Sequence, residues 1–202
     1  MKYLTKTFLL TAVLAVGAQA TVIDFDGFNT GANSYVTLVN PGETAAIGQG
    51  YQATSLGGWD IVISENYNSE WAGGVSSGSN TMGIHDAVKI SRIDSAAFDF
   101  NGGFFTNIYN TAPINLILQG WSGGTMTYST SLVLSGAGTN LAYNWTGIDY
   151  LVINNTHYDW MGLDDLQVNG GNAVPDGGAG LSLMGMALVG LVAARRQLAA
   201  VR

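Results

Sequence analysis

Apolar and polar residues alternate over short runs between residues 21 and 168, and no stretch keeps a helical period for three turns. Phe98 and Phe100, for example, fall on one face of a run in which Asp99 falls on the other. Such runs predict strands at residues 22–26, 34–38, 51–55, 59–64, 87–92, 96–100, 104–108, 114–121, 125–134, 148–153 and 161–168.

Glycine-rich turn signals separate these runs and include Asn101-Gly102-Gly103, between the strands at 96–100 and 104–108. Many short strands with frequent turns are typical of a two-sheet fold. The pattern therefore predicts an all-β domain, an antiparallel β-sandwich that is jelly-roll-like. Residues 66–80, rich in Gly, Ser and Asn, are expected to form a long loop.

The C-terminal segment departs from this pattern. A short motif precedes an uncharged apolar run at 179–194, which ends at Arg195 and Arg196; the motif is Val174, Pro175, Asp176, Gly177 and Gly178. The run is apolar on all sides, which indicates a membrane span or a deeply buried helix. As a span, it would place the two arginines in the cytoplasm and the bulk of the chain outside. A buried C-terminal helix of the domain is the alternative.

This tail resembles a PEP-CTERM sorting signal, in the variant that begins Val-Pro-Asp; Gly177 departs from the proline or serine of other variants. The resemblance implies an exported protein held in the inner membrane of a Gram-negative cell until an exosortase-type membrane protease processes it. It also implies a surface or extracellular place, because this sorting system accompanies exopolysaccharide production.

The N-terminus has the three parts of a secretory signal peptide. Basic residues in 1–6 precede an apolar run at 8–16 and a small-residue cleavage site at Ala18 and Ala20. A retained first transmembrane helix is the alternative. The predicted organisation is a signal peptide at 1–20, an ectodomain at 21–168, a linker at 169–173, a sorting segment with a transmembrane helix at 174–197 and a cytoplasmic tail at 198–202.

Charge limits the partners of the ectodomain. Between residues 21 and 173, Lys89 and Arg92 are the only two cationic residues against thirteen carboxylates, which leaves a net charge near −11. Such a surface repels phosphate backbones, so nucleic acid is not an expected partner. The chain has no cysteine, which excludes disulfides, thiolate nucleophiles and Cys-ligated zinc.

The carboxylates at the two ends of the domain suggest a metal site. Period two places Asp24 and Asp26 on one face of the opening strand, and the closing strand carries Asp164 and Asp165. This closing strand resembles that of jelly-roll carbohydrate-binding modules. The resemblance implies that the first and last strands are neighbours and that Asp24, Asp26 and Asp165 hold a structural Ca²⁺. Solvated carboxylates at strand ends are the alternative.

Aromatic residues suggest a sugar platform, because sugar rings stack on aromatic planes. Trp71, in the predicted loop, and the pair Tyr158 and Trp160 are the expected exposed members. Trp59 and Trp121 lie on apolar runs and are expected in the core.

No catalytic constellation is present in the sequence. His85 and His157 each have an Asp nearby, but the chain has no Gly-x-Ser-x-Gly elbow and no His-Glu-x-x-His motif. The expected protein is not an enzyme. It is an exported surface or matrix protein with a structural or adhesive role in an exopolysaccharide or biofilm matrix. A calcium-supported carbohydrate-binding module is the alternative, and a secreted glycoside hydrolase with a carboxylate pair comes third.

Overall fold

A computed structural model describes residues 20–30, 35–65, 76–109, 112–136, 138–156 and 159–169. Within these ranges the chain forms strands and no helix, and no helix there is long and apolar enough to cross a bilayer. The predicted signal peptide, the sorting segment, Trp71, His157 and Tyr158 lie outside these ranges, apart from Ala20.

Two antiparallel sheets carry the fold. The seven-stranded sheet runs in the order β11-β8-β13-β6-β5-β2, with β1 paired to β13; its strands are β1 (Thr21–Ile23), β2 (Tyr35–Val39), β5 (Ile61–Glu65), β6 (Asn80–Ile84), β8 (Phe98–Asn107), β11 (Thr139–Ile148) and β13 (Met161–Val168). The six-stranded sheet runs in the order β10-β9-β12-β7-β4-β3; its strands are β3 (Thr44–Gly48), β4 (Tyr51–Ser55), β7 (Ala87–Arg92), β9 (Ile114–Ser122), β10 (Thr125–Leu134) and β12 (Tyr150–Asn155).

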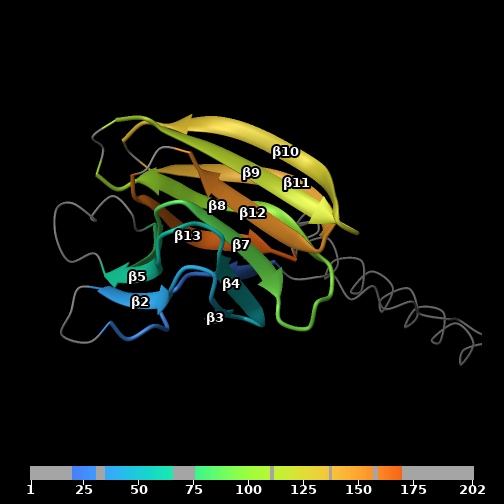
Figure 1. Cartoon of the computed structure of the whole chain (residues 1–202), viewed down its shortest axis with the longest axis horizontal. Helices are drawn as coiled ribbons and strands as arrows, with labels where there is room; N and C mark the ends of the chain where they lie inside the picture. Colours follow the sequence, from blue (N-terminus) through green and yellow to red (C-terminus); the bar gives the residue numbers. More distant parts are fainter. Residues whose placement is uncertain are drawn as a thin grey trace, which may run out of the picture.

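The two sheets face each other across one core, with β9 and β10 at one side of the molecule and β2 and β3 at the other (Figure 1). Alternate residues of both sheets fill that core, among them Phe98, Phe100, Ile90 and Leu151. The predicted all-β, antiparallel two-sheet class is confirmed, and so is the shared face of Phe98 and Phe100. The first and last strands are neighbours, as expected, since Thr21 pairs with Val168.

The predicted break at residues 101–103 is wrong, because β8 runs without interruption from Phe98 to Asn107. Gly102 has φ +143°, and a β-carbon there would lie 1.9 Å from the carbonyl oxygen of Leu141 in β11. The glycine therefore serves a close approach of two strand backbones rather than a turn.

Three strands were not predicted: β3, β6 and β11. The opening strand is also shorter than the predicted 22–26 and ends at Ile23, since Phe25 has φ +60° and a turn follows. Asp24 and Asp26 therefore do not share a strand face.

A bulge in β13 shifts its buried face by one residue. Leu163 and Leu166 both lie in the core although three positions separate them. Asp165 between them has φ +47°, and the register with β8 slips between Asp164 and Gln167. The extra residue accommodates this change of face.

Candidate functional site

Several of the connections between the two sheets meet at one end of the sandwich. Ile61, Ile84, Met161 and Asn107 form one row across the seven-stranded sheet, because each pairs with the next. Each is the end of its strand from which the chain crosses to the other sheet or arrives from it. Side chains just outside this row therefore come together although they are far apart in the sequence.

Three rings form an aromatic cluster at this end: Trp59, His85 and Trp160. Trp59 and His85 are stacked, with ring centroids 4.4 Å apart and planes 28° apart. The rings of Trp160 and His85 meet edge to face, with centroids 5.4 Å apart. His85 is buried, whereas Trp59 is 51% exposed. The cluster thus presents an open indole on a buried support.

One carboxylate fixes the support. Asp86 Oδ1 lies 3.1 Å from His85 Nδ1, and Asp86 Oδ2 accepts a hydrogen bond of 2.8 Å from the backbone N–H of Gly58. A β-carbon at Gly57 would lie 2.2 Å from that of Asp86, so glycine is required for this close approach. Asp86 therefore holds both the imidazole and the loop that carries Trp59.

Trp160 is held through its backbone. Its N–H donates to Asp159 Oδ1 at 2.9 Å, and its carbonyl oxygen accepts a hydrogen bond of 3.1 Å from the N–H of Ile108. The side chain is half-buried. Trp160 was a predicted platform residue, and the structure brings it against His85, the ring on which Trp59 stacks.

The prediction that Trp59 lies in the core is wrong. The apolar run that suggested a strand at 59–64 begins as a strand only at Ile61, and Trp59 belongs to the connection before it. Trp121 is half-buried rather than in the core, on β9, where its ring stacks on that of Tyr150. The sequence offered one signal for the exposure of Trp59: the preceding Gly57-Gly58 turn.

The predicted calcium ligands fall into two groups: Asp24 bonds within its own turn, and Asp26 and Asp165 bond to residues 76–80. Asp24 Oδ1 accepts a hydrogen bond from the N–H of Asp26, at 3.3 Å. Asp26 Oδ1 accepts from the N–H groups of Ser79 and Asn80, at 2.7 and 3.0 Å. Asp165 Oδ1 accepts from the hydroxyl of Ser77 at 2.6 Å. Asp26 and Asp165 thus flank one segment, residues 76–80.

Among the described residues, no group of three or more His, Cys, Asp or Glu side chains is placed to hold a metal ion. The structure therefore does not gather Asp24, Asp26 and Asp165 around one point, and Oδ1 of Asp26 and Oδ1 of Asp165 already accept hydrogen bonds.

Asp164, which was not among the chosen ligands, is the most buried of these carboxylates. Its Oδ2 accepts hydrogen bonds from the N–H groups of Ser76 and Ser77, at 2.7 and 3.0 Å. Burial raises the pKa of Asp164 from its ordinary 3.8 to about 6, and the hydrogen bonds from Ser77, Ser76 and Asp165 oppose that rise. Together Asp26 and Asp164 hold the 76–80 segment from its two ends.

The His85–Asp86 pair supplies two parts of a catalytic triad, but its geometry is that of packing. The imidazole is buried between two indoles and its Nδ1 faces Asp86. The imidazole therefore packs against the indoles of Trp59 and Trp160.

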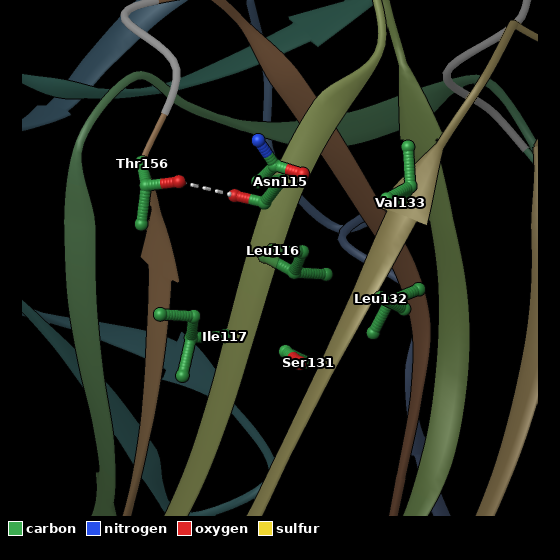
Figure 2. A pocket seen from close by; sticks show the side chains of 7 residues that line it. All are labelled: Asn115, Leu116, Ile117, Ser131, Leu132, Val133 and Thr156. Atoms are coloured by element: carbon green, nitrogen blue, oxygen red, sulfur yellow. Dashed lines mark hydrogen bonds between the residues drawn. The ribbon is translucent and has the colours of Figure 1, made fainter.

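A shallow hollow of about 360 Å³ lies on the outer side of β9 and β10 (Figure 2). The hydroxyl of Thr156 donates to the carbonyl oxygen of Asn115 at its rim, at 3.0 Å. Its other lining residues are Leu116, Ile117, Ser131, Leu132 and Val133. The hollow has neither a titratable side chain nor an aromatic ring, so it lacks the groups for acid–base catalysis and for stacking a sugar.

No protein-family model and no curated protein sequence matches this chain. The fold is similar to that of a DUF4465 family protein from Bacteroides caccae, with a TM-score of 0.53 and 10% identity, covering 76% of this chain and 100% of that chain. It is also similar to TmCBM61 in complex with β-1,4-galactotriose, with a TM-score of 0.39 and 9% identity, covering 59% and 88%. CBM51 from Clostridium perfringens GH95, in complex with methyl-galactose, gives a TM-score of 0.33 and 12% identity, covering 66% and 99%. At 10% identity, the likeness to the DUF4465 family protein concerns the fold alone.

Proposed function

We propose that this protein binds carbohydrate, and that the aromatic cluster of Trp59, His85 and Trp160 is its binding site. The observation that carries the proposal is the half-exposed indole of Trp59 stacked on a buried imidazole. An exposed tryptophan fixed in this way offers a flat apolar face to the C–H groups of a sugar ring. Because the ring is already held in place, little side-chain entropy is lost on binding.

Polar groups beside the cluster suit sugar hydroxyls. The carboxylates of Asp86 and Asp159 lie next to the rings, and each is held by a backbone N–H, from Gly58 and Trp160 respectively. A few fixed polar groups around an apolar face are the usual composition of a small-ligand site. This arrangement favours binding over hydrolysis, since its one imidazole is occupied in packing.

A glycan array with the purified full chain tests the proposal. Binding to at least one glycan is expected, and Trp59→Ala should weaken it by about tenfold or more, as for a tryptophan at the centre of an interface. Trp160→Ala should weaken binding too, because the ring of Trp160 no longer supports the ring of His85.

Tyr35→Ala is the matched control: Tyr35 is 59% exposed on β2, away from the cluster. It should bind as the unchanged protein does. If all glycans are bound equally by the unchanged chain and by Trp59→Ala, the aromatic cluster is not the site.

The wider role we propose is that of an exported protein of an exopolysaccharide or biofilm matrix, sorted by an exosortase-type protease. The signal-peptide pattern at 1–20 and the tail from Val174 to Arg196 support it, and a sugar-binding domain suits such a place. Intact mass spectrometry of the protein recovered from its cells should show loss of residues 1–20 and a cut near Pro175. A full-length mass in the cytosolic fraction would refute the export.

Calcium remains part of this proposal. The support for it is that Asp26 and Asp165 both bind the 76–80 segment, next to the buried Asp164. Carboxylate and carbonyl oxygens are the ligands that Ca²⁺ prefers. An ion there would stabilise the joined ends of the domain.

A further inference from the structure

The outer face of the six-stranded sheet carries a row of polar and aromatic side chains. Tyr150 on β12 pairs with Trp121 on β9 and with Ser91 on β7, and Ser91 pairs with Gln52 on β4. Their strand neighbours, such as Leu151, are buried in the core. Because side chains alternate along a strand, this row of four faces outward.

Two rings of the row stack on each other. The rings of Trp121 and Tyr150 have centroids 5.8 Å apart and planes only 12° apart, and both side chains are half-buried. Gln52 donates to the hydroxyl of Ser91 at 3.3 Å in the same row. Aromatic surface and hydroxyl-binding groups therefore adjoin across four strands.

A cation lies over one of these rings. Lys89 on β7, two residues before Ser91 and on the same face, has its ammonium 5.8 Å from the ring centroid of Tyr150. Lys89, Gln52, Ser91 and Tyr150 all line a shallow hollow of about 260 Å³, which Arg92, Ser95 and Asp149 complete.

The charges of this hollow are unusual for the domain. Lys89 and Arg92 are the only cationic residues between positions 21 and 173, and both line it. Arg92 is engaged by Asp94, with two hydrogen bonds of 2.8 and 2.5 Å, and Asp149 accepts from the N–H of Gly123. Lys89 forms no ion pair within the described ranges.

We infer that this face binds a carboxylate-bearing sugar, such as a uronic acid unit of an acidic polysaccharide. The sugar ring would lie against the stacked rings of Trp121 and Tyr150, its carboxylate on the ammonium of Lys89, and its hydroxyls on Gln52 and Ser91. The rest of the domain is acidic and repels an anionic chain, so the free ammonium selects both the place and the orientation of the ligand. Tyr150 begins β12 and the aromatic cluster lies beyond its other end, so the two sites are separate.

Calorimetric titration of the purified full chain tests the inference. The probes are trigalacturonate and its methyl ester, which differ in charge but have the same ring, together with alginate and hyaluronan oligomers as further acidic sugars. At least one acidic probe should bind, and trigalacturonate should bind about tenfold more tightly than its ester, as for a charge-assisted hydrogen bond. Raising the salt concentration should remove most of that difference.

Variants of Lys89 separate charge from packing. Lys89→Met should bind trigalacturonate only as well as the ester, while Lys89→Arg should keep the preference and Trp59→Ala should leave it unchanged. Equal melting temperatures show that the variants are folded. The inference is overturned if no acidic probe binds, if acid and ester bind alike, or if Lys89→Met keeps the preference. None of these outcomes bears on the aromatic cluster, which the Trp59 variants address.

Discussion

Gly120 of β9 lies against the indole of Trp145 in β11, on the opposite sheet. A β-carbon at Gly120 would lie 3.1 Å from Cε3 of Trp145, and 3.0 Å from Cγ2 of Ile148. Trp145 is only 8% exposed, and its ring stacks on Tyr128 with centroids 5.3 Å apart and planes 7° apart. The missing side chain on one sheet thus makes room for the largest side chain of the other.

Gly120→Ala should therefore lower the free energy of unfolding by about 1–3 kcal/mol, the usual cost of overpacking a core. Urea denaturation measures it. Gly27→Ala is the control, because a β-carbon there meets nothing within 4 Å. Equal stability of Gly120→Ala and Gly27→Ala would show that the indole has space to spare.

Two features should require glycine at position 78: its close contact with Asp26 and its positive φ angle. It has φ +61°, and a β-carbon there would overlap Asp26 Oδ2 at 1.5 Å. Gly124 has a similar φ, +76°, with open space around it. Gly78→Ala should therefore destabilise the protein by about 1 kcal/mol or more beyond Gly124→Ala, since it also displaces the acceptor of two N–H groups.

A double-mutant cycle checks the cause. In an Asp26→Ala background, Gly78→Ala should cost no more than Gly124→Ala, because the obstructing carboxylate is gone. An unchanged excess cost in that background would show that the strain has another origin.

Stability should depend on pH through Asp164. Its pKa is about 6 in the folded protein against an ordinary 3.8, so the folded state binds the proton more tightly. The resulting stability is fully present below pH 3.8 and is lost as the pH rises through 6. Between pH 4 and pH 7, the melting temperature should therefore fall less in Asp164→Asn than in the unchanged chain. Asp24→Asn, which removes an exposed carboxylate, should follow the unchanged chain; parallel curves for all three would exclude this role.

Calcium should raise the melting temperature if the carboxylates beside residues 76–80 bind it. A ligand of the native state at one hundred times its Kd stabilises by about 2.7 kcal/mol. Asp26→Asn should reduce the shift, and magnesium should not replace calcium, because it demands a smaller and more regular site. A melting temperature indifferent to excess calcium would end the calcium proposal.

Local sequence sufficed for strands whose pattern and turns agree. Residues 51–55, 87–92, 125–134 and 161–168 form strands with the predicted bounds. Local sequence failed where the backbone of a strand far away in the sequence determines the conformation of a residue. Gly102 reads as part of a turn, but its role is set by Leu141 on another strand. The strand β11, which pairs with β8, was missed for another reason: Leu141, Tyr143 and Trp145 do alternate with exposed positions, but this pattern was not recognised as a strand.

Contacts between distant residues also limit what the sequence says of the site. Trp160 was predicted to be exposed because it stands in the cluster Tyr158-Asp159-Trp160, and the structure shows it half-buried against His85. Trp59 was missed, because its exposure depends on Asp86, which holds Gly58 from 28 positions away. The carboxylates of the closing strand drew attention to Asp165, while the burial of Asp164 depends on residues 76 and 77.

Because Thr21 pairs with Val168, the chain enters its first strand and leaves its last strand at the same end of the sandwich. From that end, β13 extends to Met161, which follows Trp160. At about 3.3 Å per residue, this strand spans roughly 26 Å. A chain tethered through residues beyond Asn169 would thus stand on its support with the indole of Trp59 at the far tip, free to meet polymer in the surrounding medium. The outer face of the six-stranded sheet, whose Tyr150 lies near the tethered end, would meet polymer close to the support.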